Sequence, residues 1–208
     1  NAKVLKKYSG SRGFKRLERT NKLVISKVQG KKKPTDEQLK ELKNKYAPTV
    51  AMRLGHGHVV DAGDGIRKNI LICGGTGCTS SGSQKIIDAL ENEIKANGLE
   101  TEVQVVKTGC FGLCALGPIM IVYPEGTFYS MVKEEDIPEI VTEHLLKGRI
   151  VSRLVYDETV ADDGIKSLNE TDFYKKQMRV ALRNCGVINP EKIDEYIARD
   201  GYEALGKV

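Results

Sequence analysis

The sequence predicts an α/β sandwich in which short strands alternate with amphipathic helices. Residues 69–72 and 119–123 are apolar runs with the length of buried strands. Residues 82–96 and 133–147 repeat apolar side chains at helical spacing, which is typical of helices that bury one face. The order of strand, helix, strand, hairpin and helix favours a sandwich of about 80 residues.

A strand, a helix and a second strand make up the first half of the predicted sandwich. The strand at 69–72 leads into a glycine-rich loop, and we expect Ser81 or Ser83 to cap the helix that follows. The apolar face of this helix consists of Ile86, Leu90 and Ile94. Residues 102–105 alternate between polar and apolar side chains, as a half-buried strand does, and a second glycine-rich loop follows them.

A hairpin and a helix complete the predicted sandwich. Residues 119–123 and 127–131 are predicted strands, joined by a tight turn at Pro124-Glu125-Gly126. The helix at 133–147 is expected to end at Gly148. Its buried face should consist of Ile137, Ile140, Val141 and Leu145.

The N-terminal region differs from the rest of the chain in its charge. Residues 1–56 contain 16 Lys and Arg against 4 Asp and Glu, whereas the remaining residues contain 17 against 24. We interpret residues 1–33 as a basic, partly disordered leader, and a basic arm that binds nucleic acid is the alternative. A short helix capped by Thr35 is expected next, and the glycines within 54–65 predict a linker.

A short helical extension is predicted after the sandwich. Residues 157–170 have the polar composition of a linker, and helices are expected at about 172–184 and 190–199. Asn189 should cap the second of these helices. The predicted domains are a leader and linker (1–66), the sandwich (67–156) and the extension (157–208).

Composition indicates a cytoplasmic protein with no membrane span. No stretch approaches the ~18 consecutive apolar residues of a spanning helix, and the chain begins without a basic-then-apolar signal peptide. It starts at Asn1 rather than Met, which raises the expectation that it is a piece of a longer protein. Its five cysteines are few for a secreted disulfide scaffold and favour metal binding or redox chemistry.

Four of the cysteines form two pairs in matching glycine-rich loops. Cys73 and Cys78 belong to the first loop as C-x4-C, and Cys110 and Cys114 belong to the second as C-x3-C. Each loop follows a predicted strand, so the four thiolates should meet at one end of adjacent strands. Iron–sulfur clusters need four such ligands and a backbone that approaches the inorganic sulfides closely, which glycine permits. The spacing therefore favours these four residues as cluster ligands.

Two other interpretations of the paired cysteines remain open at this point. Structural zinc also takes four thiolates, and it would give a zinc-stabilised binding module whose basic arm contacts nucleic acid. A thiol–disulfide oxidoreductase normally uses C-x2-C, which neither pair provides. Cys185 has no neighbouring thiol in sequence, so we interpret it as a semi-buried structural residue. His144 is expected to pack in the core, and His56 and His58 are expected to be exposed.

Three motifs resemble one known family. CGGTGC, TGCFGLCALGP and IMIVYPEGTFYS are similar to the thioredoxin-like [2Fe–2S] ferredoxin domain, above all to its copy at the N-terminus of the flavin- and NADH-binding subunit of NAD(P)-reducing hydrogenases of the electron-bifurcating type. The module of respiratory NADH dehydrogenase is a more distant likeness. The resemblance covers about residues 67–156 and resumes at FYKKQMRVALRNCGVINPEKIDEYIARDGYEAL, which looks like the lead-in to the flavin domain of that subunit.

The resemblance implies one-electron transfer through a [2Fe–2S] cluster in a thioredoxin-like sandwich. In that family the two cysteine pairs ligate the cluster, and Cys73, Cys78, Cys110 and Cys114 occupy the same motif positions. The implied partners are a flavin- and NADH-binding domain and other iron–sulfur subunits of a hydrogenase or dehydrogenase. FMN and NAD(P) would bind only downstream of this chain, so we expect no catalytic residue here and no turnover of NADH by the chain alone. Nucleic acid is not an expected partner.

Overall fold

The computed structural model describes residues 35–54, 65–157, 160–161, 164–165, 168 and 171–206. The chain divides into two compact units, residues 1–39 and 40–208, and the described part of the first is only the start of a helix. The predicted leader at 1–33 lies outside the described residues, as do His56, His58 and nearly all of the predicted linker. In the described part of the chain, no helix has both the length and the hydropathy needed to cross a membrane.

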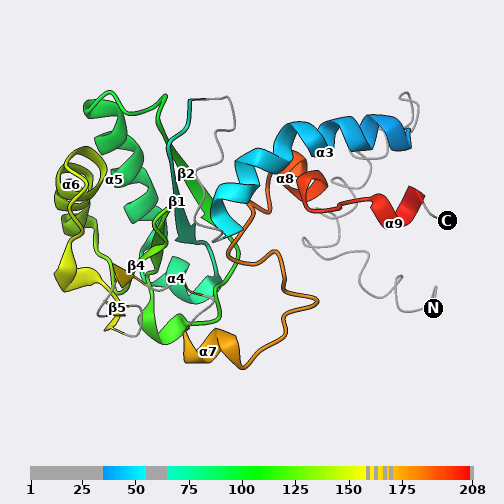
Figure 1. Cartoon of the computed structure of the whole chain (residues 1–208). Coiled ribbons are helices and arrows are strands. Elements are labelled where there is room, and N and C mark those ends of the chain that lie inside the picture. Colours follow the sequence, from blue (N-terminus) through cyan, green and yellow to red (C-terminus); the bar gives the residue numbers. More distant parts are fainter. Residues whose placement is uncertain are drawn as a thin grey trace, which may run out of the picture. The chain divides into compact units, whose positions relative to one another are not determined.

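A four-stranded mixed sheet forms the centre of the fold (Figure 1). Its strands are β1 (Lys68–Cys73), β2 (Val103–Thr108), β3 (Met120–Tyr123) and β4 (Thr127–Tyr129), in the order β2-β1-β3-β4. Strand β1 pairs in parallel with β2 and antiparallel with β3, and β3 and β4 form the predicted hairpin. A parallel pair needs a crossover connection, which helix α5 (Ser83–Ala96) supplies. The four predicted strands and this helix are therefore confirmed.

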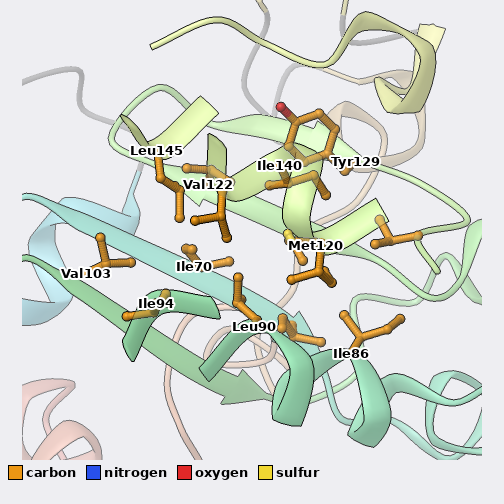
Figure 2. Close-up of a cluster of buried hydrophobic side chains, with 14 of the residues drawn as sticks. Ile70, Ile86, Leu90, Ile94, Val103, Met120, Val122, Tyr129, Ile140 and Leu145 are labelled. Carbon is orange, nitrogen blue, oxygen red and sulfur yellow. The ribbon is translucent and has the colours of Figure 1, made fainter. Parts of the chain in front are cut away.

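Helices cover one face of this sheet. The predicted second helix is formed by three consecutive segments: η3 (Glu134–Asp136), α6 (Ile137–Glu139) and the π-helical η4 (Ile140–Leu146). Alternate residues of β1, Ile70 and Ile72, point into the core that α5 and these segments enclose (Figure 2). Gly148, with φ 69°, follows the helix as expected. Burial of these side chains is the main stabilising contribution on this face.

Residues from outside the sandwich cover the other face. Leu71 and Cys73 of β1 lie in a second buried cluster. Met52 of η1 (Met52–Leu54) and Tyr174 of α7 (Asp172–Lys175) complete that cluster, together with Leu168. The division at residues 66 and 156 stays a prediction. The structure adds that segments before and after the sandwich pack against it.

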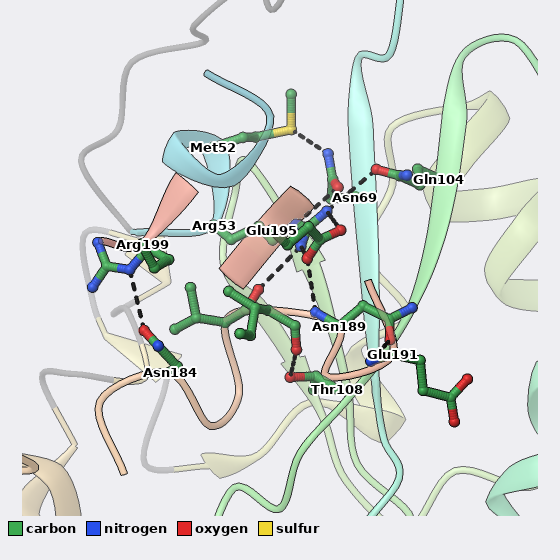
Figure 3. A network of polar contacts seen from close by, with 12 residues as sticks. Met52, Arg53, Asn69, Gln104, Thr108, Asn184, Asn189, Glu191, Glu195 and Arg199 are labelled. Carbon is green, nitrogen blue, oxygen red and sulfur yellow. Dashed lines mark hydrogen bonds and ion pairs between the residues drawn. The ribbon is translucent and has the colours of Figure 1, made fainter. Parts of the chain in front are cut away.

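A buried ion pair joins these two flanking segments to the sheet (Figure 3). Arg53 Nη1 lies 2.6 Å from Glu195 Oε2 of helix α8 (Ile193–Ala198). The Arg53 guanidinium also donates to Asn69 Oδ1 of β1 at 3.0 Å and to Gln104 Oε1 of β2 at 3.2 Å. Its Nη1 donates to the Val187 carbonyl at 3.1 Å. Every part of this guanidinium thus has a partner, as a buried charge requires.

The N-terminal helix begins as the sequence predicts. Helix α3 (Asp36–Ala51) follows Thr35, whose Oγ1 accepts a bond from the Gln38 N–H at 3.3 Å. Gln38 Oε1 accepts in return from the Thr35 N–H at 3.0 Å. This reciprocal pair of bonds is a capping box.

Several predicted details of secondary structure are wrong. Helix α5 has Gly82 as its N-cap, at φ 92° and without a side-chain bond, in place of Ser81 or Ser83. A short helix, α4 (Thr76–Ser80), occupies part of the first predicted loop. The 3-10 helix η5 (Ser152–Leu154), for which the sequence gave rise to no expectation, lies between Gly148 and the end of the predicted sandwich.

The two predicted C-terminal helices are much shorter than expected. The first, α7, ends at Lys175, because Tyr174 packs into the core while Met178, Val180 and Leu182 are 90%, 72% and 60% exposed. A helix needs a buried apolar face for stability, and these side chains do not provide one. The second, α8, is the six-residue segment given above. Asn189 Oδ1 instead accepts from the Glu191 N–H at 2.9 Å, which makes a turn before the helix. The remaining short elements are β5 (Val160–Ala161), β6 (Gly164–Ile165) and α9 (Glu203–Gly206).

Acid should destabilise this fold through His144, which is buried as predicted. The Tyr129 hydroxyl accepts from the Val151 N–H at 3.1 Å and forms a hydrogen bond with His144 Nδ1 at 2.8 Å. Burial lowers the pKa of His144 to about 4, with a further lowering by Lys68. An unfolded histidine has a pKa of about 6.5. The contribution of the buried, neutral His144 to the free energy of unfolding is therefore complete above about pH 6.5, and it is lost as the pH falls from there to about 4.

Urea unfolding at neutral pH and near pH 5 measures this effect. We expect the free energy of unfolding of the wild type to fall by about 2 kcal/mol more than that of His144→Asn over this interval. An equal fall in both proteins would assign the acid sensitivity to the carboxylates instead.

Candidate metal centre

The two cysteine loops leave the sheet at the same edge, as the sequence predicts. In the parallel register of β1 and β2, Cys73 pairs with Thr108. The N–H of Gly74 then donates to the Thr108 carbonyl at 2.8 Å, which ties the start of the first loop to the start of the second. Parallel pairing therefore brings together cysteines that are far apart in sequence.

The first pair of cysteines is buried. Cys73 is the last residue of β1, and Cys78 belongs to α4. Each of these residues is 1% exposed. Burial raises the pKa of the Cys78 thiol to about 12, and a hydrogen bond with Cys73 contributes to the rise. With no cation present the Cys78 thiol stays protonated, so a metal must displace its proton on binding.

The second pair is exposed to solvent. The sulfurs of Cys110 and Cys114 are 3.7 Å apart, with Cys114 at the start of η2 (Cys114–Leu116). Gly112, at φ 86°, turns its N–H toward the Cys110 sulfur at 3.3 Å. Glycine adopts this left-handed conformation without the steric penalty that a side chain brings. The hydrogen bond with Cys110 raises the pKa of the Cys114 thiol.

Close contacts between the two loops bring the pairs together. A Cβ added to Gly75 would lie 2.9 Å from Cys110 Cβ, and one added to Gly77 would lie 3.7 Å from Cys114 Sγ. A Cβ added to Gly117 would lie 2.6 Å from Cys78 Sγ. Each of the two loops thus requires glycine at a point where a cysteine of the other loop lies close.

This donor set suits a binuclear cluster better than a single ion. Among the described residues, no three Cys, His, Asp or Glu side chains converge on one point where a single metal ion would bind. The four thiols instead form two pairs, one buried and one exposed. A [2Fe–2S] cluster takes two ligands on each of its two irons, which is the arrangement that two adjacent pairs provide.

Comparison with known proteins assigns this segment to a family. Residues 63–145, which include the sheet and both loops, match the family model described as thioredoxin-like [2Fe-2S] ferredoxin. A 2Fe-2S ferredoxin of Clostridium pasteurianum is 44% identical over 77 residues, which are 37% of this chain and 76% of that relative. The chain belongs to the thioredoxin-like [2Fe–2S] ferredoxin family. The predicted fold class and the predicted [2Fe–2S] cofactor are thereby confirmed.

Two further relatives extend the comparison. A solved structure of a thioredoxin-like [2Fe–2S] ferredoxin from Aquifex aeolicus is 35% identical, with 42% of this chain and 88% of that chain covered and a TM-score of 0.40. The NADP-reducing hydrogenase subunit HndC of Solidesulfovibrio fructosivorans is 68% identical over 34 residues, which are 16% of this chain and 7% of the relative. This chain therefore contains a 34-residue segment similar to part of a hydrogenase subunit.

Sequence reasoning missed two residues that support the ferredoxin loops. The hydroxyl of Tyr174 donates to the Phe111 carbonyl, next to Cys110. Cys185, semi-buried as predicted, lies against the second loop, because a Cβ added to Gly109 would be 3.4 Å from its sulfur. Tyr174 lies 63 residues after Phe111 in the sequence, and Cys185 lies still further from the loop that it contacts. The sequence marked this segment by its predicted helix and by the similarity of FYKKQMRVALRNCG to a hydrogenase sequence, and neither signal indicated these contacts.

Proposed function

We propose that Cys73, Cys78, Cys110 and Cys114 hold the [2Fe–2S] cluster of this ferredoxin, and that the chain passes single electrons through it. When bound, the cluster supplies a site that gains and loses one electron. The observation that carries the proposal is the meeting of two cysteine pairs from two loops, with glycine at the points of closest approach.

The two pairs have different tasks in this proposal. Cys73 and Cys78 anchor the cluster in the second hydrophobic core, where burial keeps water from their sulfurs. Cys110 and Cys114 face solvent and present the cluster to an electron donor or acceptor. The Gly112 N–H donates toward the Cys110 sulfur, and such bonds stabilise the added negative charge of a reduced cluster.

Single serine substitutions test the ligand assignment. Each of Cys73→Ser, Cys78→Ser, Cys110→Ser and Cys114→Ser should lose or alter the visible absorption of the oxidised protein and the EPR signal obtained on reduction with dithionite. Cys185→Ser is the matched control, since Cys185 contacts the same loop without being a proposed ligand, and it should keep both signals.

The metal content of the purified protein tests the competing zinc module. A protein that is colourless after anaerobic reconstitution with iron and sulfide, and that holds one equivalent of zinc, would refute electron transfer and support the binding module. An unaltered spectrum in any of the four ligand variants would refute the assignment of that cysteine.

We infer further that this ferredoxin works within a larger cytoplasmic assembly. The similarity to HndC supports a place at the N-terminal part of the flavin subunit of an NAD(P)-reducing hydrogenase or NADH dehydrogenase complex. The partners are then a flavin- and NADH-binding domain, with FMN and NAD(P), and other iron–sulfur subunits. Free, unpaired cysteines suit a reducing compartment. Reduction of the cluster by NADH should occur only when that flavin domain is present, and stopped-flow absorption of the two preparations tests this.

A further inference from the structure

A small cavity lies between the second face of the sheet and the segment that follows α7. It has a volume of about 150 Å³, and its lining includes Arg53, Tyr123, Arg179, Arg183 and Cys185. The cavity is separate from the four proposed cluster ligands, none of which lines it. Three arginines around so small a space suggest a negatively charged ligand. Whether such a ligand is needed depends on how far carboxylates of the protein already neutralise these arginines.

The three arginines differ in their partners among the described residues. Arg53 is neutralised by Glu195, as described above. Arg179 donates to the Cys185 carbonyl at 3.2 Å and stacks on the Tyr174 ring, 4.4 Å from its centroid. Arg183 donates to a backbone carbonyl, that of Arg199, at 3.4 Å. The charge of Arg183 also acts on the Asp200 carboxylate, which is paired with Lys43. Within the described part of the chain, neither Arg179 nor Arg183 has a carboxylate within ion-pair distance, and the described residues that line the cavity include no acidic side chain.

Tyr123 belongs to the wall of the same cavity. The residue is 7% exposed, and its hydroxyl makes no hydrogen bond to any residue that the structure describes. Burial raises the pKa of Tyr123 to about 12, while the charges of Arg53 and Arg179 act to lower it. The hydroxyl therefore keeps its proton at neutral pH and is available as a donor.

We propose that this cavity is a binding site for a small tetrahedral oxyanion such as inorganic phosphate, held by Arg179, Arg183 and the Tyr123 hydroxyl. Guanidinium groups match the oxygens of such anions in pairs of hydrogen bonds. Because about 10–15 Å³ of such space holds one water molecule, the cavity has room for a small oxyanion. Cys185 and Arg53 complete the wall and take no part in holding the anion.

The site lies close enough to the second cysteine loop to affect it. Phe111, next to Cys110, lines the cavity, and Cys185 lies against Gly109. If the proposed function holds, the bound anion opposes addition of a further negative charge to the cluster. Phosphate should then lower the reduction potential of the protein, and the reduced protein should bind phosphate more weakly than the oxidised protein.

Calorimetric titration of inorganic phosphate into the 208-residue chain, at constant ionic strength in chloride, tests the site. We expect saturable binding of one phosphate per chain. Arg179→Gln, Arg183→Gln and Tyr123→Phe should each weaken it by at least about tenfold, since each removes a hydrogen bond to a charged group. Lys176→Gln is the matched control: it removes one positive charge from the same segment at an exposed position outside the cavity, and it should bind as the wild type does.

Three outcomes would overturn the proposal: no saturable binding at millimolar phosphate, equal affinity in Tyr123→Phe and wild type, or equal loss in Lys176→Gln and Arg183→Gln. Tyr123→Phe removes only a hydroxyl group and should fold as the wild type does. It therefore still tests the site if an arginine variant does not fold. Tighter binding of adenosine monophosphate than of phosphate would assign the cavity to a nucleotide phosphate and refute a free oxyanion. The titration measures phosphate binding and does not depend on the presence of the cluster. A negative result would therefore refute the phosphate site without bearing on the proposed electron transfer.

Discussion

Glu195→Gln is expected to lower the free energy of unfolding by about 3–5 kcal/mol. The substitution keeps the shape of the side chain but leaves the charge of Arg53 buried without its counter-ion. The side chains of Arg53 and Glu195 are 0% and 6% exposed, so water cannot replace the lost carboxylate. Glu195 Oε2 also accepts from the Asn189 N–H at 2.7 Å, and this bond to a charged acceptor is weakened as well.

Urea unfolding followed by circular dichroism measures this loss. Asp200→Asn is the matched control, because Asp200 forms an exposed ion pair with Lys43 at 2.5 Å. Asparagine also tolerates the left-handed backbone of this position, at φ 67°. An exposed pair contributes about 0–1 kcal/mol, so the control should differ little from wild type. A Glu195→Gln protein as stable as this control would show that the buried pair does not hold the flanking segments on the sheet.

Gly117→Ala should abolish most cluster incorporation without removing a ligand. The added methyl group would lie 2.6 Å from Cys78 Sγ and 3.3 Å from the Cys114 carbonyl oxygen. Neither atom can retreat easily, because Cys78 is buried and the carbonyl belongs to the backbone of η2. Accommodating the methyl group would displace either the Cys78 sulfur or the backbone of η2, and both changes disturb the position at which the two pairs meet.

Iron and sulfide content and visible absorption after anaerobic reconstitution measure this effect. Gly77→Ala is the matched control, since its Cβ would lie 3.7 Å from the Cys114 sulfur, an ordinary contact distance, within helix α4. It should keep the cluster. Equal loss in both variants would mean that the approach of Gly117 to Cys78 is not the cause.

The sequence by itself determined the sandwich and the position of the cysteine loops. Strands and helices with one buried face have a local signature, because the spacing of apolar residues along the chain follows the geometry of the element. The run at β1 and the apolar stripe of α5 are examples, and both were predicted within a residue or two. A crossover helix between two strands then implies a parallel pair, which brings two loops to one edge. The motifs within those loops indicated the family.

Only the tertiary structure decided what covers the second face of the sheet and which cysteines are buried. Arg53 and Glu195 are 142 positions apart, and in the sequence each looks like an ordinary surface charge. The predicted helix at 172–184 is shorter than expected for a related reason. Tyr174 packs into the core, whereas the apolar side chains after it are exposed and do not pack against an apolar surface. The cavity with Tyr123 likewise combines residues from three segments. Such contacts depend on long-range packing, which periodicity within a short window does not encode.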